Sequence, residues 1–313
     1  MKIALVVFKK IGAYGGYEVG IRNSMLACLS VGEDARIEFA QDKNDIIKLA
    51  SSNDIIHISN YKEYASITNA IPRNNILHLH GYHYEVHPEI NGIAKKLFLV
   101  QREIDVFHAS NILYSSKSLM DFYGTNRGKY IYNCYDNRKF YPAKRKGNGI
   151  ISTINITYSK GVDRLAALGK NNGYVNVIGD TCPDITGKNT KGPYNIKRLG
   201  KMSADEVAKQ LRRHRIFVHP SRMESCSIAI IEAMACGLPI IASNVGDNKV
   251  IVGDAGIIID EWDNKTVASA VSYIDDSYEL LRENAINRAT NFTPLKMGFA
   301  LLNEYARIVK ENK

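Results

Sequence analysis

Residues 219–246 read HPSRMESCSIAIIEAMACGLPIIASNVG and contain the end of a strand, a loop, a helix and the start of a second strand. The first strand ends at the initial His-Pro, and the loop after it carries Glu224. We expect the helix to begin at Ser225 or Ser227, because serine caps helix N-termini, and to end at Gly237. Strand, helix and strand in this order favour neighbouring parallel strands. The N–H groups and the dipole of such a helix start predict an anion site suited to a diphosphate.

The same alternation of short β-branched runs and longer amphipathic stretches extends over almost the whole chain. Strands are expected at 2–7, 54–59, 75–80, 106–110, 129–133, 149–154, 174–178, 195–199, 216–219, 239–243 and 256–259. Helices are expected at 17–29, 162–168, 204–212, 227–236, 277–290 and 294–310. Alternating strands and helices imply parallel sheets with helices on both faces. The predicted fold class is therefore α/β, with doubly wound sheets.

The chain length and one linker-like stretch predict two domains. A chain of 313 residues is about twice the length of a domain of roughly 150 residues. The stretch PAKRKGN at 142–148 is polar and basic and carries both Pro and Gly, which is typical of a domain boundary. We therefore expect a first domain at 1–143, a second at 144–292, and a helix at 293–313 that can cross back to the first.

The composition excludes several classes of protein. Hydrophobic residues make up 45% and charged residues 23%, which is typical of a folded chain and excludes a disordered one. The net charge of 41 − 32 = +9 is spread over both halves, which argues against one basic arm for nucleic acid. The five cysteines form no C-x-x-C pair, so neither a disulfide framework nor a zinc knuckle is predicted. Because no apolar run reaches the length of a membrane span, we expect a cytoplasmic protein that can touch the inner face of the membrane.

Two glutamates in the quoted segment carry a resemblance to a known enzyme family. Glu224 and Glu232 are separated by seven residues and lie within P-S-x-x-E and E-A-M-A-C-G-x-P. This pattern resembles the signature of glycosyltransferase family 4, whose members are retaining nucleotide-sugar enzymes. The resemblance implies the GT-B fold, in which two Rossmann-like domains face each other across a cleft. The first domain would shape the acceptor site, and the second would bind the nucleotide sugar.

The resemblance also implies roles for residues of the second domain. Glu224 would contact the hydroxyls of the donor sugar, and Glu232 those of the ribose. Lys160, which is followed by glycine, would hold the donor's diphosphate. The backbone at the start of the helix would hold it as well, through Ser225, Cys226, Ser227 and Ile228.

Two motifs of the first domain resemble family elements. Gly15 and Gly16 begin the stretch GGYE, which resembles the family's GG-x-E loop near the donor phosphate and the acceptor. His80 ends the stretch LHLH before a glycine, which resembles the family's V-H-[DG] element. It would contact the donor sugar, with His78 on the same face of the strand as the alternative.

One feature departs from the family pattern. An arginine usually precedes the Lys-Gly pair, and the two cations together neutralise the diphosphate; here Asn155 or its neighbours occupy that place. Arg222, Arg198 and Arg164 are candidates to replace it. The chain has no Asp-x-Asp pair, so we expect no metal in the donor site and no cofactor beyond the UDP- or GDP-linked donor.

The acceptor is the least defined partner. The aromatic and histidine-rich stretch at 81–87 suits a glycan ring, and it also suits a nucleobase. The stretch IAKKLFLV at 93–100 could contact an anionic membrane carrying a lipid acceptor, or form a core helix. The sequence thus favours a hexose-type transferase acting on a glycan or lipid-linked acceptor. The alternatives are transfer to a hydroxylated nucleic-acid base, a non-catalytic nucleotide-sugar-binding protein, and an epimerase.

Overall fold

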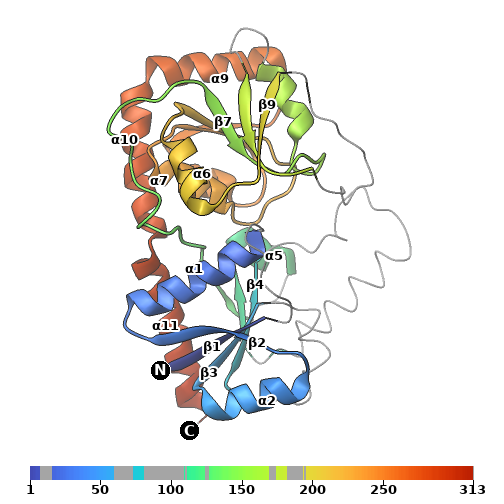
Figure 1. Ribbon diagram of the computed structural model, residues 1–313, viewed down its shortest axis with the longest axis vertical. Coiled ribbons are helices and arrows are strands. Elements are labelled where there is room, and N and C mark those ends of the chain that lie inside the picture. Colours follow the sequence, from blue (N-terminus) through green and yellow to red (C-terminus); the bar gives the residue numbers. More distant parts are fainter. Residues whose placement is uncertain are drawn as a thin grey trace, which may run out of the picture. The chain divides into compact units, whose positions relative to one another are not determined.

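The computed structural model describes residues 1–7, 16–59, 73–80, 109, 111–123, 127–168, 174–181, 193 and 195–312. The chain forms two compact units (Figure 1). The first combines Met1–Cys134 with Thr293–Lys313, and the second is Tyr135–Phe292. Residues 135–143, which the sequence assigned to the first domain, thus group with the second, because their contacts lie there. Among the described helices, none is both long and apolar enough to cross a membrane.

A parallel sheet of six described strands forms the centre of the first unit. Its spatial order is β2-β1-β3-β4-β5-β6, and every neighbouring pair is parallel. The strands are β1 (Lys2–Val7), β2 (Asp34–Phe39), β3 (Ile55–Ile58), β4 (Asn75–Leu79), β5 (Ile112–Tyr114) and β6 (Lys129–Tyr130). The described helices of this unit are α1 (Gly16–Ser30), α2 (Lys43–Ser52), α5 (Lys117–Tyr123) and α11 (Pro294–Glu311).

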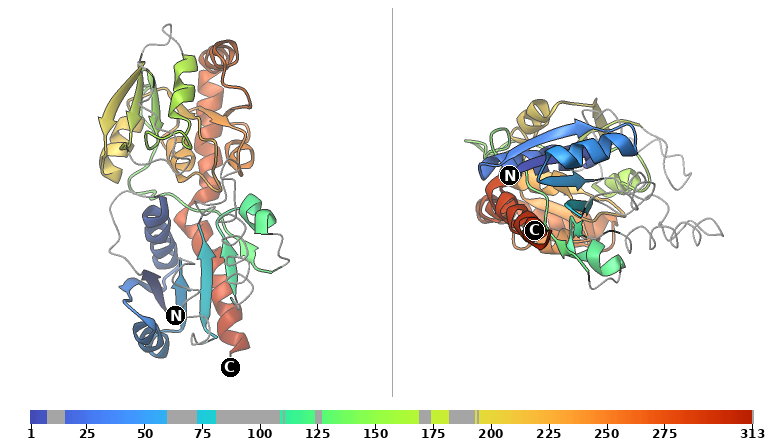
Figure 2. Two further views of the ribbon diagram at one scale, coloured as in Figure 1. Left: turned by 90° about the vertical axis from the view of Figure 1, so that its right-hand side faces the viewer. Right: turned by 90° about the horizontal axis from the view of Figure 1, so that it is seen from below.

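Helices bury both faces of this sheet. Alternate residues of a strand point to opposite faces, and in β1 they enter two different cores. Ala4 and Val6 pack with residues of α2 and α5, whereas Ile3 and Leu5 pack with residues of α1 and α11. The C-terminal helix α11 is therefore part of the first unit, and Figure 2 shows it in red beside the strands of that unit.

The second unit contains another parallel six-stranded sheet. Its order is β12-β11-β10-β7-β8-β9. Read from β9, this is the doubly wound order 3-2-1-4-5-6, so the winding reverses between β7 and β10. The strands are β7 (Ile150–Thr153), β8 (Val175–Ile178), β9 (Ile196–Gly200), β10 (Ile216–His219), β11 (Ile240–Ser243) and β12 (Gly256–Ile259).

Both faces of the second sheet are buried as well. The 3-10 helix η3 (Val162–Leu168) and α9 (Asn264–Asp276) pack on one face, against a core that includes Ile216 and Val218 of β10. The intervening Phe217 is also fully buried, and α7 (Ile228–Ala235) contacts β10 and β11. The other described helical segments of this unit are α6 (Ala204–Leu211), α8 (Asn248–Val252), α10 (Tyr278–Ala289) and η5 (Thr290–Phe292).

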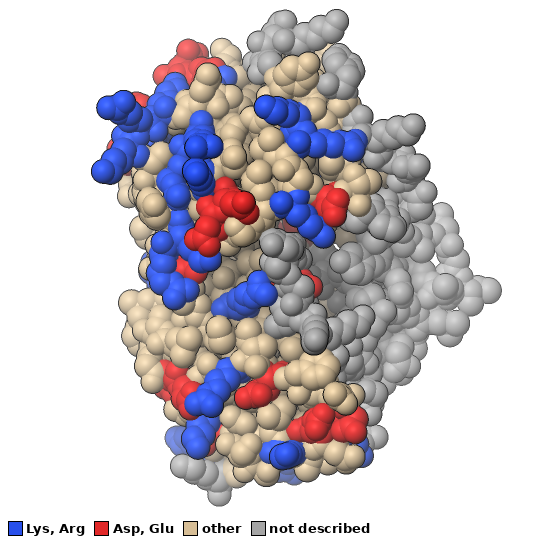
Figure 3. All heavy atoms as spheres, viewed as in Figure 1, with Lys and Arg blue, Asp and Glu red and all other residues tan. Residues whose placement is uncertain are grey.

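These sheets confirm the predicted α/β class. The expected strand 2–7 coincides with β1, and the expected strands 216–219 and 256–259 coincide with β10 and β12. Two strands, β2 and β5, were not predicted. The expected strand at 106–110 lies almost entirely outside the described residues. On the face shown in Figure 3, acidic side chains lie among the basic ones, and the basic ones gather mainly over the second unit.

Candidate active site

The loops after β7 and β10 carry the principal candidate residues of the second unit. Lys160 follows β7, and Glu224 follows β10. These two strands are paired, with Ile216 opposite Ile150. The winding of the sheet reverses between them, and in open α/β sheets ligands bind outside the carboxyl ends of the strands at such a point. The fold thus brings Lys160 and Glu224 together. In the sequence, only the resemblance to a known family connected these two residues.

Lys160 and Glu224 form a part-buried ion pair. The distance from Lys160 Nζ to Glu224 Oε1 is 2.7 Å, and the side chains are 37% and 13% exposed. His219, the last residue of β10, donates from Nε2 to the same carboxylate oxygen at 3.0 Å. Burial alone would raise the pKa of Glu224, but Lys160 and His219 outweigh burial and hold the pKa well below its ordinary value. Glu224 is therefore ionised at neutral pH.

Two glycines allow the loops around this pair to touch. Gly161 has φ +70°, and a Cβ added there would lie 2.0 Å from the carbonyl oxygen of Pro220. Gly246 has φ +53°, and its Cβ would lie 2.0 Å from the carbonyl oxygen of Glu224. Any other residue would push the loops apart, since a side chain would meet rigid backbone as well as the strain of positive φ.

The start of α7 lies directly after this loop. Ser227 is the N-cap, and its side chain accepts a hydrogen bond from the backbone N–H of Ile230. Ser227 Oγ also lies 3.2 Å from His219 Nε2, so the cap and the histidine are joined. Ser225, Cys226 and Ser227 are buried. The first N–H groups of a helix have no acceptor within the helix, so this end is electrostatically suited to phosphate oxygens.

Glu232 lies in the middle of α7, and its carboxyl has a raised pKa. Burial raises the pKa of Glu232 to about 8, and the negative charge of Asp136 adds to the shift. The carboxyl is therefore mainly protonated at neutral pH, in contrast to Glu224. Two carboxyls whose pKa values are pushed in opposite directions are typical of functional sites.

Two of the three arginines considered as substitutes for the missing cation are held by protein groups. Arg222 forms a bidentate pair with Asp163, at 2.7 and 2.8 Å, and stacks on the ring of Tyr158. Arg164 Nη1 donates to the carbonyl oxygen of Pro220 at 3.0 Å and to Ser243 Oγ at 3.2 Å. Arg198 lies on β9, at the edge of the sheet.

Asn155 is exposed and lies in the loop that leads from β7 to Lys160. Its side-chain oxygen accepts a hydrogen bond from the backbone N–H of Asp180 at 3.4 Å. At this point of the loop before Lys160, the protein therefore presents a neutral amide.

Only some of the residues predicted to act in the first unit lie among the described residues. Gly15 lies outside the described residues, as do 81–87 and 93–100, and Gly16 is the first residue of α1. His80 follows β4 directly, with its ring tilted against that of His78 at a centroid distance of 4.0 Å. Burial lowers the pKa of His80 to about 4, which keeps its ring neutral.

His219 was not assigned a role from the sequence, although it belongs to the quoted segment. The usable signal was its place at the carboxyl end of an apolar strand, where functional side chains of open α/β sheets gather. Its contact with Glu224 depends on how the loop folds back over five residues, which no periodicity encodes.

A family model matches part of the second unit. The family model described as Glycosyl transferases group 1 matches residues 162–276. The O-antigen chain mannosyltransferase B of Escherichia coli is 33% identical over 113 residues, which are 35% of this chain and 30% of that protein. A D-inositol 3-phosphate glycosyltransferase of Rhodococcus opacus is 33% identical over 112 residues, 34% of this chain and 25% of that protein. The matches thus span less than a third of the length of these relatives.

Solved structures match the whole chain. Sucrose-phosphate synthase from Thermosynechococcus elongatus superposes with a TM-score of 0.79 at 15% identity over 99% of both chains. HepE of Anabaena in complex with UDP-glucose gives a TM-score of 0.73 at 15% identity, over 98% of this chain and 100% of that one. At such identity the likeness shows the fold alone. Residues 162–276 therefore form a glycosyltransferase group 1 domain, in a chain that has the GT-B fold of its structural neighbours.

Proposed function

We propose that this protein is a retaining glycosyltransferase that moves a hexose-type sugar from a UDP- or GDP-linked donor to a glycan or lipid-linked acceptor. The observation that carries the proposal is the junction of Lys160, Glu224 and His219 beside the N-terminus of α7, at the point where the sheet reverses. This junction offers a cation and helix N–H groups for a diphosphate, and an ionised carboxylate for sugar hydroxyls.

The donor would be bound without a metal ion. Lys160 and the backbone from Ser225 to Ile228 would hold the phosphates, and Glu232 the ribose hydroxyls. A cation and a helix N-terminus supply the positive potential that a bridging metal supplies in other transferases. One solved neighbour supports a nucleotide-linked donor, since structures of HepE contain UDP and UDP-glucose.

The reaction would need stabilisation of two developing charges. As the bond between the sugar and the diphosphate breaks, negative charge grows on the leaving oxygen, and Lys160 and the helix start would stabilise it. Positive charge grows at the sugar carbon, near the ionised Glu224. The leaving phosphate oxygen can take the proton of the acceptor hydroxyl as the new bond forms, so no separate protein base is required. His80 would position the donor sugar.

The acceptor would be chosen by the first unit. A saccharide acceptor is favoured by the relative whose name identifies it as an O-antigen chain mannosyltransferase. Contact with the cytoplasmic face of a membrane belongs to the same proposal, because the Lys pair at 95–96 would meet anionic lipid.

A second candidate is a nucleotide-sugar-binding protein without transferase activity. Asn155 favours it, because a neutral amide stands where a cation would stabilise the leaving group. The engagement of Arg164 and Arg222 favours it as well, since each is already held by carbonyl oxygens or a carboxylate.

A donor screen tests the proposal. Thermal shifts with UDP, GDP and their sugars identify the nucleotide, and transfer assays on glycan and lipid-linked acceptors follow with the donor that stabilises the protein. A chelator in the assay tests independence from metal. We expect Lys160→Ala and Glu224→Ala to lose at least 100-fold in transfer, because each removes a charged contact that stabilises the transition state by about 2.7–4 kcal/mol in a shielded site.

The matched control is the exposed ion pair of Lys139 and Asp205 in the same unit, which has the same 2.7 Å separation. Lys139→Ala and Asp205→Ala should keep full activity. Wild-type transfer by both site variants would refute the assignment. Binding of a nucleotide sugar with no product from any acceptor would favour the second candidate, and conversion of the donor alone would indicate an epimerase.

A further inference from the structure

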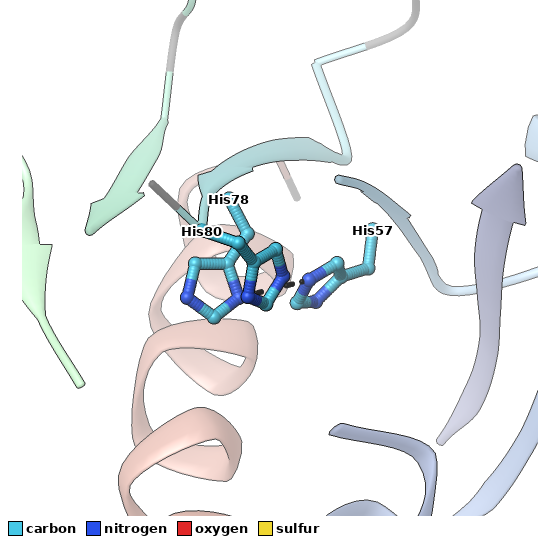
Figure 4. A group of neighbouring side chains, drawn as sticks. All are labelled: His57, His78 and His80. Carbon is cyan, nitrogen blue, oxygen red and sulfur yellow. Dashed lines mark hydrogen bonds between the residues drawn. The ribbon is translucent and has the colours of Figure 1, made fainter. Parts of the chain in front are cut away.

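Three histidines of the first unit converge although they come from different parts of the sequence. His57 lies on β3, His78 on the neighbouring parallel strand β4, and His80 directly after β4 (Figure 4). His78 and His80 are two residues apart, so their side chains leave the same face of the strand. The rings of His57 and His78 are completely buried. One ring nitrogen from each of the three residues lies within 4.8 Å of the other two.

The spacing of His57 and His78 is that of two ligands on one ion. His78 Nδ1 is 3.2 Å from His57 Nε2, and the ring centroids are 5.1 Å apart at an interplanar angle of 61°. A tetrahedral zinc ion with bonds of about 2.0–2.1 Å separates its ligand nitrogens by about 3.3 Å. Without an ion, one proton lies between these two nitrogens in a hydrogen bond. An ion can replace that proton when the proton moves from His78 Nδ1 to His78 Nε2.

Tyr305 makes a hydrogen bond with the nitrogen of His57 that faces away from His78. Its hydroxyl, on the buried side of α11, is 2.6 Å from His57 Nδ1, and His57 Nε2 is directed at His78. When Nδ1 carries the proton and donates it to the hydroxyl, Nε2 has a lone pair for an ion. Metal-bound histidines commonly make a hydrogen bond of this kind from the nitrogen that does not bind the metal.

His80 is the third member of the group, and both of its ring nitrogens are buried. Its ring lies over that of His78 and against the backbone of α1, where a Cβ on Gly20 would come within 2.9 Å of His80 Nδ1. A modest rotation of this ring would turn a nitrogen toward the other two. Glycine at position 20 leaves the space for that rotation.

We propose that His57, His78 and His80 form a binding site for a late first-row divalent cation such as Zn²⁺, with three imidazole ligands and one open position. Neutral imidazole nitrogens suit Zn²⁺, Cu²⁺ and Ni²⁺, whereas Mg²⁺ and Ca²⁺ require oxygen ligands. The sequence predicted no metal site, because the third histidine joins the His-x-His pair only through strand pairing. The inference does not rest on the proposed sugar transfer, but the two roles compete for His80, because an ion bound there would withdraw this residue from the donor sugar.

Metal binding by the full-length chain, prepared without a polyhistidine tag, tests the site. After treatment with a chelator, equilibrium dialysis against Zn²⁺ and elemental analysis should show one tightly held ion per chain. Co²⁺ in place of Zn²⁺ should give the strong visible absorption of a four- or five-coordinate ion. His57→Gln and His78→Gln should each lower the affinity at least 100-fold, while His214→Gln, at a buried histidine of the second unit, should not change it.

A further variant separates loss of ligands from loss of folding. Tyr305→Phe keeps all three ligands and removes only the hydroxyl that orients His57, so it should fold, as judged by circular dichroism, and bind Zn²⁺ about 10-fold more weakly. The proposal is overturned if the wild-type chain retains well under one ion. It is equally overturned if Co²⁺ shows only the weak spectrum of an octahedral ion, or if folded His78→Gln binds like the wild type.

Discussion

Lys160 Nζ lies 2.7 Å from Glu224 Oε1, although the two residues are 64 positions apart. The pair joins the loops that follow β7 and β10, and His219 contacts the same carboxylate oxygen. A diphosphate approaching Lys160 would compete with Glu224 for that ammonium group. Donor binding and the freeing of Glu224 for sugar hydroxyls would thus be one event, so the geometry of the Lys160 loop should control both.

Gly161→Ala should therefore disrupt donor binding. The new methyl group would lie 2.0 Å from the carbonyl oxygen of Pro220, which displaces the loop that carries Lys160. We expect affinity for the nucleotide diphosphate, measured by calorimetry, to fall at least 10-fold. Gly32→Ala is the matched control, because Gly32 also has positive φ, at +84°, but a Cβ there meets nothing within 4 Å. Both variants bear the strain of about 1–2 kcal/mol for a left-handed alanine. Equal affinities in the two would contradict this account.

Much of the fold could be predicted because the buried strands of parallel sheets are short apolar runs. β1 and β10 have this form, and both were located to the residue. β2 was missed because only continuous apolar runs were taken as strands. Asp34, Arg36 and Glu38 alternate along it with apolar residues, at the edge of the sheet where one face meets water. Such alternation is typical of a half-buried strand, so β2 could have been found from its period of two.

Two missed helices carried usable signals at their starts. α2 begins after Asp42, whose carboxylate accepts hydrogen bonds from the backbone N–H groups of Asn44 and Asp45. α9 begins after Asp263 in the same way. Aspartate caps of this kind are visible in a sequence, so both helices could have been found from capping instead of from apolar periodicity.

The candidate site could be predicted only in part. Lys160, Glu224 and Glu232 were picked out by motif, and the structure brings the first two together. The role of His219, the opposite pKa shifts of the two glutamates and the meeting of His57 with His78 depend on contacts between segments far apart in the chain. Such contacts exist only after the sheets have formed.

Asn155→Arg should strengthen donor binding. The substitution restores a cation in the loop before Lys160, and Asn155 is exposed, so the longer side chain has space. A new charge-assisted hydrogen bond to a phosphate contributes about 1.5–3 kcal/mol, and we expect roughly 10-fold tighter binding of the nucleotide diphosphate at low salt. Asn264→Arg adds the same charge at an exposed position of α9 and should leave the affinity unchanged. A gain of the same size in both variants would indicate only long-range attraction.

Gly298→Ala should destabilise the protein. Intrinsic helix propensity alone would favour alanine by about 1 kcal/mol, so the sign of the change is informative. The added Cβ would lie 2.3 Å from the carbonyl oxygen of Ala27 and 2.8 Å from Val31 Cγ1, which forces α11 away from α1. We expect a net loss of about 1–3 kcal/mol, seen as a lower Tm in scanning calorimetry. Asn303→Ala, at an exposed position of the same helix, should leave Tm unchanged or raise it slightly. A raised Tm for Gly298→Ala would show that the helices do not pack this closely.

Glu232 should make nucleotide binding depend on pH. With a pKa of about 8 in the free protein, this carboxyl is mainly protonated at pH 6 and mainly ionised at pH 9. A carboxylate accepts hydrogen bonds from both hydroxyls of a ribose, whereas a protonated carboxyl accepts less well, so the ionised form should be the one that binds. Below the pKa, each unit of pH then costs about a factor of 10 in affinity, and calorimetry should show binding of UDP or GDP tightening up to about 100-fold between pH 6 and pH 9. Glu232→Gln has the same shape and no proton to lose, so its affinity should vary only through the phosphate's own ionisation. Parallel pH profiles for the wild type and this variant would mean that Glu232 binds the ribose in its protonated form or does not contact it.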